Sequence, residues 1–383
     1  MKLRWLLILL TVCTPFLLID CTYSSASSAA YNELGARAAA GEMPDVVFMD
    51  GLRIAEFVQQ GLLQPLPRER FALEDIPESL LAHFEFEGEL YAIPRDYQPL
   101  ALLVNGELLA AQGFEVPADW ESLLAVGTAL TFAEREAGNE AFSAIGLTTG
   151  FYNYLPFFFQ AGGQLYGPEQ ETLQLESEAG LASLQYYADL VNQEAATVIG
   201  GEWPEVGGYT TLLNRFVEGS IAMAVVNPRM YDLVRADLGE QFSAERARLV
   251  ALPAGPAGQA TVANVRAFAL AGEPTEANLA VLEHLTSAEV LRRWVGDQET
   301  PVDYIPARLS LQDAWREVHP EVAAFSDSVS FVRPYTPPPV SPGAMAEFDR
   351  LAQEQLIAVL QQGLAPQAAL SELQAAGNRL LGE

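Results

Sequence analysis

Residues 44–65 read PDVVFMDGLRIAEFVQQGLLQP and predict the unit around which the first part of the fold is built. Residues 46–49 are apolar and are followed by Asp50. This is typical of a short strand, buried on both faces as in a parallel sheet, that closes into a turn. From Ile54 to Leu62 the apolar residues recur at helical spacing. Because ligands bind beyond the carboxyl ends of strands in open α/β sheets, Asp50 is a candidate ligand residue, with an ordinary turn or helix-cap role as the alternative.

The composition bounds the classes of protein that this chain can be. With 383 residues, half of them apolar, it is long enough for two lobes with packed cores. Its net charge of −29 argues against nucleic-acid binding, because phosphates would be repelled over most of the surface. Lys2 is the only lysine, and both cysteines, Cys13 and Cys21, lie near the start of the chain. The rest of the chain therefore offers no Schiff-base lysine, thiolate nucleophile or cysteine-based metal site.

Residues 1–21 have the pattern of a targeting segment. A basic start precedes an apolar run of 15 residues, Trp5–Ile19, which is short for a membrane span but suits a signal sequence. The sequence before Cys21 partly resembles a lipoprotein cleavage box, although Asp20 stands where a small residue is expected. Lipidation of Cys21, cleavage in the Ser/Ala-rich linker 22–30 and a retained anchor are all compatible with this pattern, and each implies export.

Strand-like and helix-like segments alternate along the rest of the chain, which predicts an α/β fold. Phe84–Pro94 is expected to form a hairpin around Gly88. Arg95–Gln98 is expected to be a polar turn that precedes an apolar strand at Leu100–Val104. An aromatic cluster follows at 151–159.

Catalytic motifs are absent from the sequence. The three histidines, His83, His284 and His319, lie far apart, and none has the spacing of a metal site. Neither a nucleophile elbow nor a dinucleotide-binding glycine motif occurs. We therefore expect no enzymatic activity, no metal and no cofactor.

Several blocks of sequence together resemble one family. They include PDVVFMDG followed by EFVQQGLLQPL, and then LYAIPRDYQPLALLVN, AGGQLYG and FVEGSIAMAVVNP. The matching blocks, in chain order, are 44–66, 90–105, 116–131, 161–167, 184–191, 216–228, 304–311 and 366–381. In this order and spacing they resemble the extracellular solute-binding proteins of ABC importers (family 1), in the branch that includes the maltose- and other sugar-binding proteins.

The resemblance implies a two-lobed periplasmic-binding-protein fold of type II, with discontinuous lobes, hinge-like crossing strands and a ligand cleft between them. Crossings are expected near 98–104, near 252–262 and around 300–306. Lobe 1 would comprise 31–100 plus 256–302, and lobe 2 would comprise 101–255 plus 303–383. The family normally begins with a strand, a helix and a second strand before the helix that matches Tyr31–Gly41, so we expect lobe 1 to lack this unit.

The resemblance also implies a function. The protein would capture a solute, most simply a mono- or oligosaccharide, outside the membrane and deliver it to ABC permease subunits. It would act as a monomer, at the periplasm or cell surface, without nucleic acid and without a cofactor. A non-transporting surface sensor and a binding protein for a non-sugar solute are the alternatives.

Sugar sites combine aromatic platforms with planar polar side chains that bind pairs of hydroxyls. Positions in the matching blocks nominate the following ligand-binding candidates: Asp50, Tyr97, Gln98, Tyr152, Tyr154, Trp203, Asn227, Arg229, Asn264 and Arg266. Two positions depart from the maltose-type members, which have an aromatic residue near Met49 and a tryptophan at the position of Arg229. These departures argue against a maltodextrin and leave room for a more polar or anionic sugar.

Overall fold

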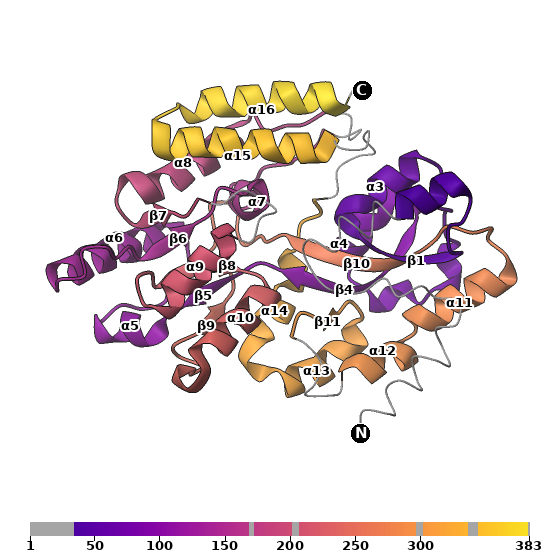
Figure 1. Ribbon diagram of the computed structural model, residues 1–383, viewed down its shortest axis with the longest axis horizontal. Coiled ribbons are helices and arrows are strands. Elements are labelled where there is room, and N and C mark those ends of the chain that lie inside the picture. The colour runs from indigo at the N-terminus through magenta and orange to yellow at the C-terminus, as the bar shows by residue number, and fades with distance from the viewer. Residues whose placement is uncertain (1–33, 168–171, 201–206, 296–301, 336–343, 382–383) are drawn as a thin grey trace.

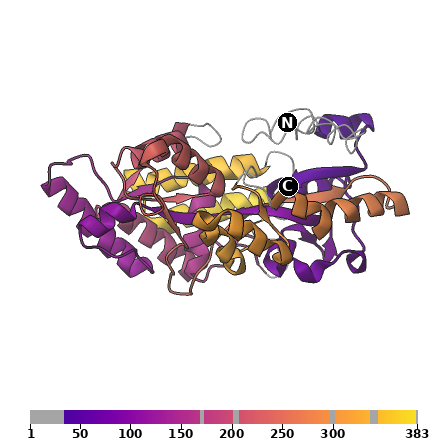
Figure 2. The ribbon, with the colours of Figure 1, turned by 90° about the horizontal axis from the view of Figure 1, so that it is seen from below.

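The computed structural model describes residues 34–167, 172–200, 207–295, 302–335 and 344–381. Two sheets form the frame, one in each half of an elongated molecule (Figures 1 and 2). The first sheet has the strand order β1 (Val46–Asp50), β10 (Ala263–Leu270), β4 (Ala92–Pro99) and β11 (Ile305–Pro306). The second has the order β7 (Ala196–Val198), β6 (Ile145–Leu147), β8 (Met223–Val226), β5 (Ala101–Val104) and β9 (Arg248–Val250).

The opening unit forms as a strand, a turn and a helix. β1 ends at Asp50, and α3 (Gly51–Gln59) begins at the next residue. β1 pairs antiparallel with β10, so the expected parallel pairing is wrong. Its side chains alternate accordingly: Val47 and Met49 are buried, whereas Phe48 is only partly buried. The predicted hairpin also forms, from β2 (Glu85–Phe86) and β3 (Glu89–Leu90), with Gly88 in the left-handed region at φ 82°.

Helices surround both sheets. Those associated with the first sheet are α3, α4 (Glu78–Leu81), α11 (Glu276–Thr286), α12 (Ala288–Val295), α13 (Leu309–Val318) and α14 (Ala323–Asp327). Those around the second sheet are α5 (Gly106–Ala111), α6 (Trp120–Glu136), α7 (Phe151–Gln160), α8 (Glu178–Asn192), α9 (Gly207–Val217), α10 (Pro228–Leu238), α15 (Ala344–Gln362) and α16 (Pro366–Leu381). A helix at 34–40 precedes β1. In Figure 1, α15 and α16 run side by side along one edge of the second half.

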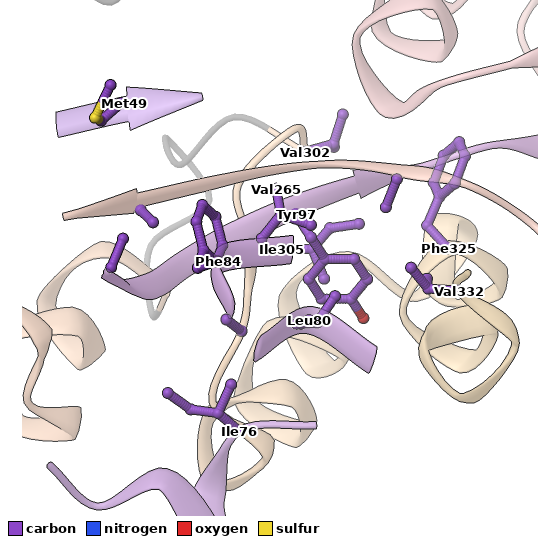
Figure 3. Packing of buried hydrophobic residues seen from close by; sticks show 14 of the residues in the cluster. Met49, Ile76, Leu80, Phe84, Tyr97, Val265, Val302, Ile305, Phe325 and Val332 are labelled. Atoms are coloured by element: carbon purple, nitrogen blue, oxygen red, sulfur yellow. The ribbon is translucent and has the colours of Figure 1, made fainter. Parts of the chain in front are cut away.

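One face of the first sheet carries its hydrophobic core. Met49, Val265 and Ala267 are buried there with Leu80 of α4 and Phe84. Figure 3 shows Tyr97 pointing from β4 toward Leu80, within the same cluster. The core therefore fixes which side chains of β1, β4 and β10 point to the opposite face.

The first two crossings lie where the sequence placed them. β4 belongs to the first sheet and β5 to the second, and only Leu100 separates them. The chain returns between β9 in the second sheet and β10 in the first. Leu100 donates its backbone N–H to the carbonyl of Val262 at 3.0 Å, so these two crossing segments run side by side.

The third crossing differs from its expected position at 300–306. β11 pairs with β4 at Ile305, so the chain is still in the first sheet there. Residues 331–333 instead run beside the second crossing, where Thr261 donates to the Phe331 carbonyl at 3.0 Å and accepts from Arg333 at 2.8 Å. Tyr335 then packs on Phe151 of α7 in the other half, with ring centroids 6.0 Å apart. Between β11 and this crossing, α13 lies against β11, and α14 lies against β4 and β9.

Candidate ligand-binding site

Four of the predicted residues meet on the face of the first sheet that lies opposite the core. The register pairs Asp50 with Arg266 and Asn264 with Gln98, so β10 stands between the other two strands. Residues two apart in a strand point to the same face, which places Asn264 and Arg266 together. The chain thus brings together side chains that are more than 160 residues apart in sequence, as the contacts below show.

Asp50 caps a helix, which is one of the two roles that its sequence position suggested, and it also contacts Asn264. Its Oδ1 accepts the backbone N–H of Leu52 at 2.9 Å, which caps α3. Its Oδ2 accepts a hydrogen bond from Nδ2 of Asn264 at 2.7 Å. Burial raises the pKa of Asp50, whereas the bonds from Leu52 and Asn264 oppose that rise. A carboxyl group held at a strand end, beside an amide, has the geometry to bind hydroxyl groups.

Three charged residues that the sequence did not nominate complete the cluster. Asp96 is fully buried and accepts from Nε of Arg95 and from Nε of Arg266. Asp303 accepts from Nε2 of Gln98 at 3.0 Å, and its carbonyl accepts from Nη2 of Arg266 at 3.0 Å. Each buried charge therefore has an opposite partner, as burial in a low-dielectric region requires.

The expected polar turn at Arg95–Gln98 is wrong, since these residues lie inside strand β4. The four letters RDYQ would have pointed to a charge cluster only if the segment had been recognised as a buried strand. Charged residues within a strand that is buried along its whole length must be neutralised by partners from other segments. Tyr304, whose ring lies 4.3 Å from the guanidinium of Arg95, is a further residue that the sequence did not identify.

Tyr97 lies on the core face of the sheet and not with Gln98. It is fully buried, and its hydroxyl donates to the carbonyl of Ser326 at 3.2 Å. Burial raises the pKa of this hydroxyl far above its ordinary value. We leave Tyr97 out of the site proposed below.

The candidates of the second half are more dispersed. Tyr154 is buried, and its hydroxyl is 2.6 Å from Oγ of Ser183, which makes it part of the core of that half. Tyr152, on the same helix α7, is partly buried, with its ring centroid 6.1 Å from that of Tyr335. Tyr335 begins the second half after the third crossing, so Tyr152 lies close to the connection between the halves.

Asn227 and Arg229 follow strand β8. Val226 pairs with Ala101, so Asn227 comes level with Leu100 of the first crossing. Its Oδ1 accepts the backbone N–H of Met230 at 2.9 Å and caps α10, while Arg229 is exposed. Trp203, Cys21 and the targeting segment 1–21 lie outside the described residues.

Polar residues thus lie in or directly after strands of both sheets. Asp50 ends β1, Asn227 follows β8, and Gln98 in β4 pairs with Asn264 in β10. Two sheets joined by crossing strands, with polar side chains at strand ends near the joints, define a two-lobed binding protein.

Comparison with known families agrees with this class. The model of the family described as bacterial extracellular solute-binding protein matches residues 19–324. The chain belongs to this family, whose members bind solutes for ABC permeases and are not enzymes. Because the family is extracellular, the protein is exported. Comparison with curated protein sequences gives no significant match.

Solved structures share the fold. The GacH receptor of Streptomyces glaucescens, solved without ligand and with acarbose, is 24% identical with a TM-score of 0.72, and the match covers 93% of this chain and 88% of that one. The cyclic alpha-maltosyl-1,6-maltose binding protein of Arthrobacter globiformis is 17% identical with a TM-score of 0.76, covering 93% and 89%. A solute-binding protein of Thermotoga lettingae bound with alpha-D-tagatose is 20% identical with a TM-score of 0.70, covering 93% and 90%. The predicted two-lobed fold is confirmed.

The part of the chain that the structure describes contains no group of three or more His, Cys, Asp or Glu residues placed to hold a metal ion. Within the same residues, no helix has the length and apolarity needed to cross a membrane.

Proposed function

We propose that this protein is the substrate-binding component of an ABC importer and that it captures a carbohydrate between its lobes. The observation that carries the proposal is the convergence of Asp50, Asn264, Gln98 and Asp303 next to the first crossing. Carboxylate and amide groups in hydrogen-bonding contact present the planar, bidentate geometry that pairs of sugar hydroxyls require. The sugar-binding structures named above support a carbohydrate as the ligand class.

The lobes move about the three crossing segments in this proposal. We keep the predicted boundary at 100/101 and at 255/256 and move the third, so that lobe 1 comprises 31–100 plus 256–332 and lobe 2 comprises 101–255 plus 333–383. Lobe 1 extends to Val332, because β11 pairs in the first sheet. The closed form would be recognised by the permease, with a monomer as the binding unit and Cys21 as the candidate lipid anchor.

Adding the correct sugar is expected to raise the melting temperature. A ligand that binds only the folded state stabilises it by RT ln(1 + [L]/Kd), which is about 2.7 kcal/mol when the ligand is at 100 times its Kd. Thermal unfolding of the purified protein against a panel of neutral and acidic mono- and oligosaccharides measures this effect. If no sugar shifts the transition and a non-sugar solute does, the carbohydrate assignment is wrong.

Replacing Gln98 by alanine is expected to weaken that binding about 2- to 10-fold, because a hydrogen bond to a neutral hydroxyl contributes roughly 0.5–1.5 kcal/mol. Isothermal titration with the sugar that the panel identifies measures the change. Gln112→Ala is the matched control, since Gln112 donates to Glu134 in an exposed pair on the other lobe. Equal affinities for the native protein and Gln98→Ala would remove Gln98 from the site.

A further inference from the structure

Arg95 stands at an irregularity in strand β4. The ladder between β4 and β10 pairs Arg266 with Asp96 and Ala267 with Pro94, so Arg95 has no partner residue on β10. This is a β-bulge, which inserts one residue into a strand and redirects a side chain. Without it, Arg95 would share the core face with Tyr97. The bulge instead directs Arg95 to the polar face, where its Nε donates to Asp96.

The guanidinium group of Arg95 lies among aromatic rings. Its Cζ is 3.9 Å from the ring centroid of Phe48, 4.3 Å from that of Tyr304 and 6.0 Å from that of Phe268. Stacking on aromatic faces is favourable for a guanidinium and holds its plane in one orientation. The aromatic surfaces that a neutral sugar ring would need for stacking are thus already covered by a cation.

Most of the hydrogen-bonding capacity of Arg95 is unused. Nε is bonded to Asp96, but Nη1 and Nη2 make no hydrogen bond to any of the described residues. The residue is 92% buried, since its relative exposure is 8%. Among the described residues, neither Nη1 nor Nη2 of Arg95 belongs to the fully buried atoms that lack a hydrogen-bond partner, so this edge of the guanidinium still reaches solvent. The edge formed by Nη1 and Nη2 is therefore available to a partner that is not part of the described residues.

The charges around Arg95 permit that partner to be an anion. Arg95 and Arg266 carry two positive charges, and Asp96 and Asp303, which contact them, carry two negative charges. Asp50 is the remaining carboxyl group of the cluster, and burial raises its pKa. Its two oxygens accept hydrogen bonds from Leu52 and Asn264, and these donors partly offset the negative charge that an incoming anion would meet.

We propose that Arg95 determines specificity for an acidic sugar, by binding a carboxylate of the ligand through Nη1 and Nη2. A planar carboxylate matches the two parallel N–H groups at the outer edge of a guanidinium. The proposal rests on the assignment of the protein as a sugar-binding subunit. It adds the class of sugar, a uronic acid or a similar carboxylate-bearing saccharide, and the residue that selects it.

Matched pairs of sugars test the proposal on the native protein. Isothermal titration compares D-glucuronate with D-glucose, D-galacturonate with D-galactose, and trigalacturonate with maltotriose. At least one acid is expected to bind about 10-fold more tightly than its neutral partner or better, which corresponds to 1.4 kcal/mol. The difference should shrink at high salt, since ions screen charge interactions. Neutral sugars that bind as tightly as the acids would overturn the proposal while leaving the carbohydrate-binding function intact. Binding of neither kind would overturn both.

Variants of Arg95 separate specificity from a structural role. Arg95→Gln is expected to lose about 10-fold or more in affinity for the acid and to keep its affinity for the neutral partner. Arg95→Lys keeps the charge but lacks the planar fork, so an intermediate loss is expected. Arg68→Gln is the control of equal charge change, because Arg68 pairs with Glu85 at an exposed position in the same lobe.

The outcomes decide between the two roles. An equal loss for acid and neutral sugars in folded Arg95→Gln would show that Arg95 only holds the sheet in place, and the proposal would fail. If Arg95→Gln does not fold, two other measurements test the proposal. One is the affinity of Arg95→Lys for the acidic and the neutral sugar, and the other is the ratio of these two affinities in the native protein at low and high salt. A ratio that does not respond to salt would also contradict the proposal.

Discussion

Replacing Asp96 by alanine is expected to lower the free energy of unfolding by about 3–5 kcal/mol. The carboxylate is fully buried and accepts from both Arg95 and Arg266. Removing it leaves two buried guanidinium groups without their shared counter-charge, and the desolvation cost of each remains. Arg266 still contacts Asp303, at 3.0 Å to the carbonyl and 3.9 Å to the carboxylate.

Urea unfolding of the native protein and of the variant measures this loss. Asp313→Ala is the control, because the side chain of Asp313 is 91% exposed and pairs with Arg316 at the surface. An exposed pair contributes about 0–1 kcal/mol, so this variant should unfold close to the native protein. Asp96→Asn keeps the shape but loses the charge, and its loss should lie between the other two. A change below about 1 kcal/mol in Asp96→Ala would contradict a buried ionic cluster on this face.

Replacing Asp349 by asparagine is expected to stabilise the protein at neutral pH. Asp349, on α15, accepts from the hydroxyl of Tyr335, the residue that follows the third crossing, at 3.3 Å. Burial raises the pKa of Asp349 to about 6, and the bond from Tyr335 only partly opposes that rise. In the unfolded chain an aspartate has a pKa of about 3.9.

The sign of the effect follows from these two values. The folded protein holds a proton on Asp349 between about pH 4 and pH 6, whereas the unfolded chain has released it. The stability associated with this group is therefore complete below about pH 4 and is lost as the pH rises through about 6. Asparagine carries no charge, so Asp349→Asn should gain roughly 2 kcal/mol at pH 7.5 and nothing below pH 4.

Unfolding by urea across this pH range measures the gain. Asp237→Asn, at an exposed position of α10, should unfold like the native protein throughout. A gain in Asp349→Asn that is the same at all pH values would mean that ionisation of Asp349 is not its cause. Because Tyr335 joins the third crossing to α7 and α15, the same measurements with ligand present would show whether this charge influences closure.

The local elements of the fold were predictable because their causes are close in sequence. The apolar run and Asp50 predict β1 and the start of α3, since a carboxylate at that position can accept the first free N–H groups of a helix. The hairpin at β2 and β3 follows from alternation around Gly88, which adopts a positive φ at little cost. The order of the sequence blocks was sufficient to indicate the family and the two-lobed fold, because the family pattern extends over residues 19–324.

The site was only partly predictable. Asp50, Gln98, Asn264 and Arg266 were nominated from their positions in the blocks that resemble the family, and the structure brings these four together. Arg95, Asp96 and Asp303 were missed, because a polar segment such as RDYQ is locally indistinguishable from a turn. Nothing within ten residues of Arg95 shows that β10 and β11 will enclose it.

The sequence by itself determined the class of the fold. It also contained the pattern of a targeting segment at 1–21 and the first two crossing segments, near 98–104 and near 252–262. Only the tertiary structure decided which side chains face one another. Shifting the register of a strand by one residue reverses the face to which its side chains point. The bulge at Arg95 has this effect, and it places Arg95 on the polar face and not on the core face. The third crossing likewise lies at 331–335 and not at 300–306. The reason is that β11 pairs with β4, which ends more than 200 residues earlier in the chain. Such long-range pairing depends on the whole core, and no local pattern contains it.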